Sequence, residues 1–256
     1  MTEFIRINRR LFLARLGKGT MALAVLGACG DDGSQGTTTA QGSTTAQATT
    51  TAAPSTPATT DVANYLRVNL GFVSAYIIVR GTEAGVVDTG VFGSEGAIEG
   101  ALGAADLTWA NVGHVILTHH HPDHAGSIAA VLNAASAATG YIGNADLDNV
   151  DTPRQLQAVN DGDEVFGLTV IHTPGHTAGH ISLFDAAAGV LVAGDAINGA
   201  GGGVVGPNPD FSEDHTQALA SVGKLVGSSF ETIYFGHGEP VMSGGSALIT
   251  QLVRDY

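Results

Sequence analysis

Cysteine is nearly absent from this sequence: Cys29 is the single one among 256 residues, so no intramolecular disulfide can form. Ten histidines stand against that one cysteine. This ratio points to chemistry at nitrogen and oxygen ligands rather than at thiolates. The apolar stretch at residues 20–28 is too short to remain as a membrane-spanning helix.

Positive charge is also scarce. The chain has 10 Lys and Arg against 24 Asp and Glu, a net charge of −14. Five of those basic residues and one acid lie within residues 1–29, so the rest of the chain holds 5 basic against 23 acidic residues, a net charge of −18. Such a negative surface repels phosphate backbones, so we expect no nucleic-acid partner. Strongly anionic substrates are disfavoured for the same reason unless bound metal ions offset the repulsion, so the substrate is expected to be neutral or to be bound mainly by metal and backbone.

The first 29 residues have the layout of an export signal. A basic start containing Arg9 and Arg10 precedes a short apolar stretch, which ends at Leu26-Gly27-Ala28-Cys29. The arginine pair resembles a twin-arginine signal, and the last four residues resemble a lipobox. The sequence therefore predicts an exported protein, anchored to a membrane only through lipid on Cys29. It would lie on the outer face of the cytoplasmic membrane, in the periplasm or at the cell surface. An amphipathic helix with an incidental cysteine is the alternative.

Residues 30–60 are almost entirely Thr, Ala, Gly, Ser, Gln and Pro. A segment of this composition cannot bury enough apolar surface to fold, so we predict a disordered linker. One catalytic domain is expected over residues 61–256. Over the whole chain, 44% of residues are hydrophobic and 13% are charged, a composition that suits a globular domain with a buried core.

Short β-branched runs and inserted helical patterns alternate through that domain, which predicts a layered α/β fold. Strands are expected at residues 65–70, 74–80, 85–88, 112–117, 141–143, 165–172, 180–185, 189–193 and 232–235. Helices are expected at residues 94–102, 125–138, 212–226, with Ser212 as N-cap, and 246–253.

The segment 119–124, His-His-His-Pro-Asp-His, carries the chemistry. His119 and His121 are two residues apart in extended chain, so their side chains point to the same side and can bind one ion. Pro122 turns the chain, and Asp123 and His124 then face a second position. His176, His237 and Asp195 arrive from three distant turns, and Asp195 offers a carboxylate that can bridge two ions.

The order His-x-His-x-Asp-His, then His, Asp and His, resembles the metallo-β-lactamase superfamily over essentially all of residues 61–256. Val87-Asp88-Thr89-Gly90 also resembles the early structural aspartate motif of that family. The resemblance implies an α/β fold of the αβ/βα four-layer sandwich type. It further implies one ion on His119, His121 and His176, a second on Asp123, His124 and His237, and Asp195 bridging them.

The same resemblance implies a hydrolase that attacks an ester, thioester, lactone or amide with a metal-bound hydroxide. Asp123 and Asp195 would be catalytic as well as ligands. Two zinc ions are expected from the donor set, with iron or manganese as alternatives. The carboxylate at 195 is typical of members that resemble glyoxalase II and lactonases rather than of true β-lactamases. No helical domain with basic residues for glutathione is expected after the metal motifs.

The remaining histidines have smaller expected roles. His120, His172 and His180 are expected to support the site, and His114 and His215 to be ordinary. Asp88 is expected to hydrogen-bond the metal loop. Asn198 and a flexible loop at residues 199–206 are expected to line the pocket.

Two rival functions use the same residues. The first is a mononuclear iron oxidoreductase that resembles persulfide dioxygenases, and the second is a non-catalytic zinc-binding surface lipoprotein. A small-molecule substrate is the expected partner, and the sequence leaves the oligomeric state open.

Overall fold

A computed structural model describes residues 63–256. The predicted signal at 1–29, Cys29 and the predicted linker at 30–60 lie outside the described residues, as does the expected start of the domain at residue 61. Within residues 63–256, no helix has the length and apolar character needed to cross a membrane.

Two β-sheets dominate the fold. The first has six strands in the order β1-β2-β3-β4-β5-β6, and the second has five in the order β13-β10-β9-β8-β7. The first sheet contains β1 (Asn64–Asn69), β2 (Ser74–Arg80), β3 (Glu83–Val87), β4 (Val112–Leu117), β5 (Thr139–Gly143) and β6 (Gln157–Val159). The second contains β7 (Glu164–Val165), β8 (Leu168–His172), β9 (Ile181–Asp185), β10 (Val190–Val192) and β13 (Thr232–Tyr234). A separate hairpin joins β11 (Asn198–Ala200) to β12 (Gly203–Val205).

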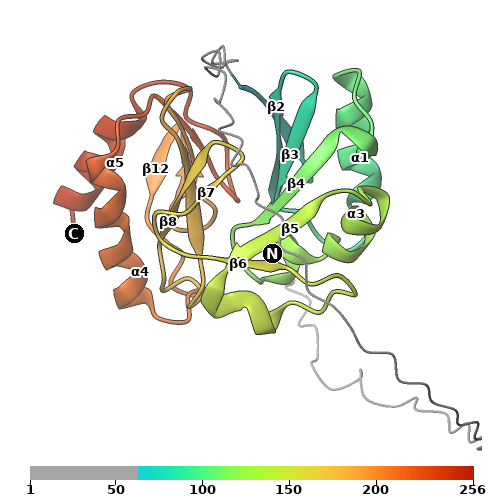
Figure 1. Ribbon diagram of the computed structural model, residues 1–256. Coiled ribbons are helices and arrows are strands. Elements are labelled where there is room, and N and C mark those ends of the chain that lie inside the picture. The colour runs from blue at the N-terminus through green and yellow to red at the C-terminus, as the bar shows by residue number, and fades with distance from the viewer. Residues whose placement is uncertain (1–62) are drawn as a thin grey trace, which may run out of the picture. The chain divides into compact units, whose positions relative to one another are not determined.

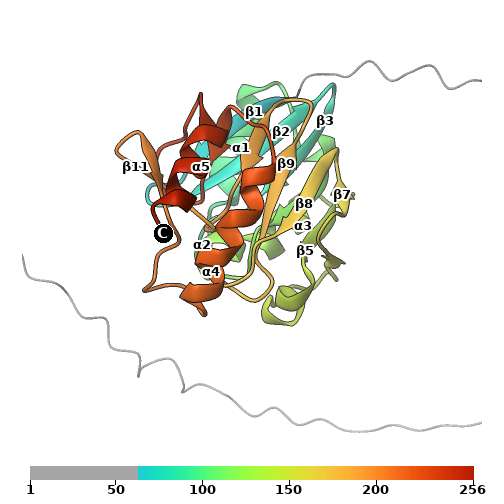
Figure 2. The ribbon, with the colours of Figure 1, turned by 90° about the vertical axis from the view of Figure 1, so that its left-hand side faces the viewer.

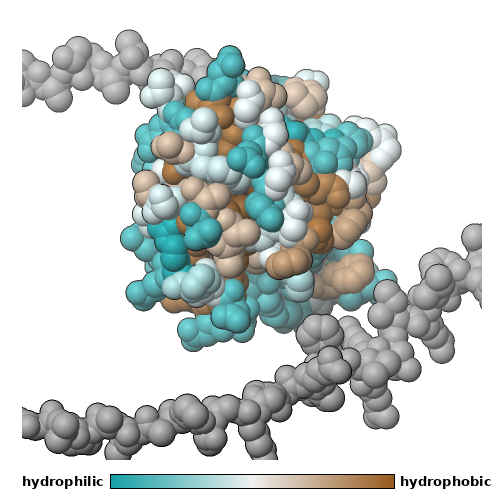
Figure 3. All heavy atoms as spheres, turned by 90° about the vertical axis from the view of Figure 1, so that its right-hand side faces the viewer, coloured by the Kyte–Doolittle hydropathy of each residue, from teal (hydrophilic) through white to brown (hydrophobic). Residues whose placement is uncertain are grey.

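Helices cover the outer face of each sheet. Figure 1 shows α1 (Glu95–Ala104) and α3 (Ile128–Ala134) on one side of the two sheets, and α4 (His215–Val222) and α5 (Gly245–Arg254) on the other. Figure 2 shows α4 and α5 in front of the second sheet. On the side of α1 and α3, hydrophilic and apolar side chains are intermingled at the surface (Figure 3). The predicted four-layer αβ/βα sandwich is therefore confirmed.

Alternation along the strands explains the layers. In β2, Ala75 and Ile77 belong to the core beneath α1 and α3, whereas Tyr76 and Ile78 belong to the core between the sheets. Successive side chains of a strand point to opposite faces, and residues 74–78 of β2 are all buried, so this strand is covered on both faces. The same logic places Leu191 of β10 beneath α4 and α5.

The predicted helix at 125–138 is wrong in its extent. The structure has a short helix α2 (Pro122–Ala125), a break, and then α3. The backbone departs from the helix at Ser127, which has φ −105° and ψ 10°, whereas Gly126 before it is still helical. Gly126 packs so closely on the preceding segment that a Cβ there would lie 2.6 Å from the Phe92 nitrogen. Ser127 reinforces this contact, since its hydroxyl donates to the Val91 carbonyl at 2.6 Å. At the carboxyl end of α3, the Arg154 guanidinium donates hydrogen bonds to the carbonyls of Leu132 and Ala138.

Two further predictions need correction. The helix expected at 212–226 begins at His215, and its N-cap is Asp214, whose carboxylate accepts from the Gln217 amide at 2.9 Å. Ser212 instead donates to the Asn208 carbonyl. The strand expected at 165–172 is a hairpin of β7 and β8. Its turn residues, Phe166 and Gly167, both have positive φ, as a type I′ hairpin turn requires.

Candidate metal centre

Loops from both sheets meet at one edge of the sandwich. Strands β3 and β4 run parallel, as do β10 and β13, so the carboxyl ends of each pair lie together. The two sheets are joined there by backbone hydrogen bonds of 2.9 Å from Ser74 to Gly236 and from Ile181 to Thr118. The predicted ligands all lie at this edge. Asp123 and His124 belong to the short helix α2, and the others lie in loops: His119, His121, His176, Asp195 and His237.

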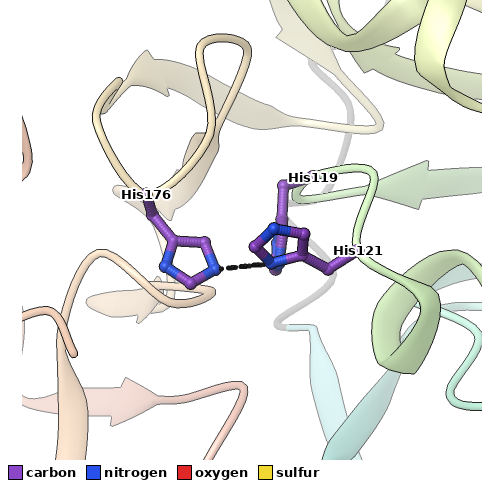
Figure 4. A group of neighbouring side chains, drawn as sticks. All are labelled: His119, His121 and His176. Atoms are coloured by element: carbon purple, nitrogen blue, oxygen red, sulfur yellow. Dashed lines mark hydrogen bonds between the residues drawn. The ribbon is translucent and has the colours of Figure 1, made fainter. Parts of the chain in front are cut away.

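Three histidines form the first cluster. His121 Nδ1 lies 3.1 Å from His119 Nε2 and 2.9 Å from His176 Nε2, and the latter two atoms are 3.2 Å apart. Figure 4 shows the rings approaching one another from two loops, with His119 and His121 on one and His176 on the other. This spacing suits three nitrogen ligands around one ion at about 2.0–2.1 Å from each.

Asp123, His124 and His237 form the second cluster. His237 Nε2 lies 3.3 Å from Asp123 Oδ2 and 3.5 Å from His124 Nε2, and the remaining pair is 3.8 Å apart. His237 is oriented by Phe72, whose carbonyl accepts from His237 Nδ1 at 2.6 Å. The second cluster is wider than the first and has one carboxylate in place of a histidine.

Asp195 lies between the two clusters. Its Oδ2 atom is 3.4 Å from His176 Nε2 and 3.2 Å from His237 Nε2. Its Oδ1 atom is 3.4 Å from His124 Nε2, yet it is buried and accepts no hydrogen bond. A buried carboxylate oxygen without a donor is costly unless a cation satisfies it. These residues therefore fit two metal ions with Asp195 between them; that they bind metal stays a prediction.

The histidines of the first cluster are held in the neutral form that binds metal. Burial lowers the pKa of His119 well below its usual value, and nearby histidines lower it further. Burial likewise lowers the pKa of His121. Burial brings the pKa of His176 down to about 4, although Asp195 opposes this shift.

The second cluster is charged instead. Burial acts to lower the pKa of His124, but Asp195, Asp88 and Asp123 together raise it to about 9. For His237, burial is again outweighed, and the hydrogen bonds to Asp123 and Asp195 raise the pKa to about 11. Burial acts to raise the pKa of Asp195, yet His124 and His237 hold it well below the usual range.

We predict that the two ions differ in proton release. At pH 7 an ion entering the first cluster meets neutral imidazoles and releases almost no protons. An ion entering the second cluster displaces protons from His124 and His237, about two per ion, because a histidine ligand must be deprotonated. Affinity at the second cluster should therefore rise with pH up to about pH 11, where His237 loses its proton, and less steeply above about pH 9, where His124 has already lost its own. Titration calorimetry in buffers of different ionisation enthalpy measures both releases, and equal release at the two steps would contradict the assignment.

Asp88 orients the metal loop, as the sequence predicts. It accepts from His124 Nδ1 at 2.8 Å and from the Thr118 amide at 2.7 Å. Its backbone has φ +60°, which turns the chain sharply after β3. By fixing Nδ1, Asp88 leaves His124 Nε2 to face the second cluster.

His180 supports the loop of Asp195, as expected of it. Its ring is fully buried and its Nε2 accepts from the Asp195 amide at 2.9 Å, while Nδ1 lies 2.8 Å from Thr173 Oγ1. Burial keeps the pKa of His180 well below its usual value, so the ring is neutral and can accept that bond.

Asp146 is a supporting residue that sequence reasoning missed. It is fully buried in the 3-10 turn Asn144–Asn149. Its carboxylate accepts from the Thr177 hydroxyl at 2.6 Å, the Gly179 amide at 2.7 Å and the His120 amide at 3.1 Å. It thus ties together the two loops that carry the first cluster. No local pattern distinguishes it from the other aspartates of this turn region.

We expect Asp146→Asn to weaken the first cluster selectively. The amide nitrogen cannot accept, so at least one buried donor loses its partner, and unfolding free energy should fall by about 2 kcal/mol. Affinity for the first ion should fall about 10- to 100-fold. Chemical denaturation with chelator present and metal titration measure the two effects. Asp148→Asn, at an exposed site in the same turn, is the matched control. Equal effects from both substitutions would argue that the hydrogen bonds of Asp146 do not hold the two loops together.

A cavity of about 1550 Å³ opens beside the clusters. Its lining includes Asp123, Asp195, His121, His176 and His237 together with many apolar side chains. Asn198, Val205 and Gly206 line it as predicted, although residues 198–205 form the β11–β12 hairpin rather than an irregular loop. His215, expected to be ordinary, also lines it.

Comparisons of the sequence and of the fold with known proteins point to the same family. A family model described as the metallo-beta-lactamase superfamily matches residues 68–237. A solved structure, a metallo-beta-lactamase family protein from Thermus thermophilus, superposes with a TM-score of 0.61 at 23% identity, covering 76% of this chain and 79% of that one.

Two curated relatives are similar in sequence. The uncharacterized protein YobT of Bacillus subtilis is 27% identical over 65% of this chain and 83% of its own. A hydroxyacylglutathione hydrolase of Alkalilimnicola ehrlichii is 38% identical over 60% of this chain. The match spans only 56% of the length of that hydrolase.

Proposed function

This chain belongs to the metallo-β-lactamase superfamily, and we propose that it is a hydrolase that binds two metal ions and acts on a small ester, thioester, lactone or amide. The position of Asp195 carries the proposal. Its carboxylate lies within 3.4 Å of ring nitrogens from both clusters, and one of its buried oxygens has no hydrogen-bond donor. A non-catalytic zinc protein has no need of a carboxylate shared between two clusters that open into one cavity.

In this proposal His119, His121 and His176 hold one ion, and Asp123, His124 and His237 hold the other. When bound, the ions lower the pKa of a water molecule and polarise the scissile carbonyl. The chain's own residues position the nucleophile and the metal-binding side chains. Asp123 and Asp195 orient the nucleophile, Asp88 fixes His124, and His180 fixes the loop of Asp195.

Metal content tests the proposal directly. The donor set contains nitrogen and oxygen only, which suits zinc and also admits iron or manganese. We expect elemental analysis of the full chain to find about two ions per chain, with turnover on an ester, thioester or lactone panel that a chelator abolishes. About one iron per chain, with oxygen uptake on a persulfide, would instead identify an oxidoreductase of the same fold.

Export and a lipid anchor at Cys29 are proposed from residues 1–29. Two signals support the anchor: the arginine pair at 9 and 10, and the small residues before Cys29. Labelling with a radioactive fatty acid tests it. The natural chain should be labelled and found with membranes, and Cys29→Ser should be unlabelled; label on the Cys29→Ser chain would refute the anchor.

A further inference from the structure

The cavity is far larger than the reacting group of an ester. Its volume is about 1550 Å³, and the metal-binding candidates occupy one part of its lining. Pockets that enclose drug-sized ligands are typically about 300–1000 Å³. A short acyl group placed at the clusters would leave most of the cavity filled with water, so the space suits a larger substrate.

Most of the remaining wall is apolar and comes from separate segments, with Asn198, Asn208, His215 and Tyr256 as its polar members. Phe92 follows β3, Phe211 precedes α4, and Leu219 lies within α4. Phe92 is 91% exposed and Phe211 is 67% exposed. Large apolar side chains held in water beside a metal site gain free energy when a ligand covers them, about 25 cal/mol for each Å² of apolar surface removed from water.

No lysine or arginine lines this cavity in the part of the chain that the structure describes. Four basic side chains are bound elsewhere: Arg67 to Glu239, Arg80 to Asp185, Arg154 to helix carbonyls and Lys224 to the His172 carbonyl. The acids that do line the cavity, Asp123 and Asp195, are at the metal clusters. A negative group on the distant part of a substrate would therefore meet a mostly apolar wall with no lysine or arginine to pair with it.

We infer that the substrates are uncharged carboxylic esters with a long apolar acyl chain, which lies along Phe92, Phe211 and Leu219. The inference rests on the proposed function and adds the substrate class. In the reaction, water adds to the acyl carbon, the ester C–O bond breaks, and a carboxylic acid and an alcohol form; the acid then releases one proton. No other reactant is required.

A chain-length series tests the class. With the metal-loaded full chain and p-nitrophenyl esters, kcat/KM should rise about two- to fourfold per methylene, since burying one contributes up to about 0.8 kcal/mol. From butanoyl to octanoyl this amounts to roughly 16- to 250-fold. The half-ester of octanedioic acid, which places a carboxylate at the far end of the same chain, should be at least ~30-fold poorer than the octanoyl ester.

Variants of the apolar wall test where the acyl chain binds. Phe211→Ala and Phe92→Ala should flatten the rise with chain length. Met242→Ala is the matched control, because Met242 is also a large exposed apolar residue (64% exposed) but lies outside the cavity. It should leave the slope unchanged. A flat series in the natural chain, or equal turnover of the half-ester, would overturn the substrate class while leaving a hydrolase in place.

Binding separates this inference from the hydrolase proposal. The ketone 2-decanone is an uncharged mimic of the ester that cannot be hydrolysed, and 9-oxodecanoate is the same molecule with a distal carboxylate. Calorimetry should show at least ~30-fold tighter binding of the ketone. If no ester is turned over but the ketone still binds selectively, the hydrolase proposal fails and the binding preference stands. Equal binding of both ligands overturns the preference whatever the turnover.

Discussion

Asp195→Asn is expected to lower kcat on any ester substrate about 100- to 1000-fold and to lower metal content from about two ions per chain towards one. The amide leaves one oxygen and adds an NH₂ group among His124, His176 and His237, so it cannot satisfy two cations. Elemental analysis after dialysis against limiting metal, together with steady-state kinetics, measures both losses.

Asp210→Asn makes the same chemical change at an exposed aspartate and is the matched control. It should keep both ions and full turnover. In the metal-free protein, Asp195→Asn should also lower stability at neutral pH. The reason is that Asp195, whose pKa is depressed on folding, is charged there and stabilises His124 and His237. That difference should disappear as pH falls through its lowered pKa. Two tightly bound ions and unchanged kcat in the variant would show that this carboxylate does not bridge.

Gly236→Ala is expected to have a comparable effect without removing any proposed ligand. A Cβ at 236 would lie 2.0 Å from Asp195 Oδ1 and 2.6 Å from His124 Cε1. The backbone cannot retreat easily, because the Gly236 amide donates to the Gly194 carbonyl and its own carbonyl accepts from Ser74. We expect the carboxylate to be displaced, with at least ~100-fold lower turnover, loss of the second ion and about 1–3 kcal/mol lower stability.

Gly100→Ala is the control for a glycine change. Gly100 is exposed within α1, and a Cβ there would meet nothing within 4 Å. That variant should keep activity and gain up to about 1 kcal/mol of stability, because alanine loses less backbone entropy in a helix. Denaturant unfolding, kinetics and metal analysis on both variants provide the comparison. Full activity and two ions in Gly236→Ala would place the bridging group elsewhere.

The candidate ligands could be named from the sequence because their main signal is local. His119 and His121 share a side of an extended segment whatever surrounds them, and Pro122 turns the next residues by its own fixed φ. His176, Asp195 and His237 each stand in a turn next to glycine, and their order along the chain resembles the family. That they meet in space is what the structure adds.

The predictions that failed depended on distant contacts. The helix expected at 125–138 is interrupted because Gly126 and Ser127 pack on the segment of Val91 and Phe92, which nothing in the helical pattern encodes. The N-cap is Asp214 rather than the predicted Ser212, since both are good capping residues and the choice depends on where the preceding loop binds.

The sequence by itself determined the layered α/β class, the charge that disfavours anionic partners, and the identity of the candidate ligands, because alternation and short motif spacings are properties of the local chain. Tertiary structure alone decided the hydrogen bonds by which Asp146 joins two loops, the close approach of Gly236 to the Asp195 carboxylate, and the mostly apolar wall of the cavity. Each of these joins residues far apart in sequence. The parallel pairing of β10 with β13 brings Gly236 to Asp195, whereas the contacts of Asp146 join the loops of one sheet to those of the other.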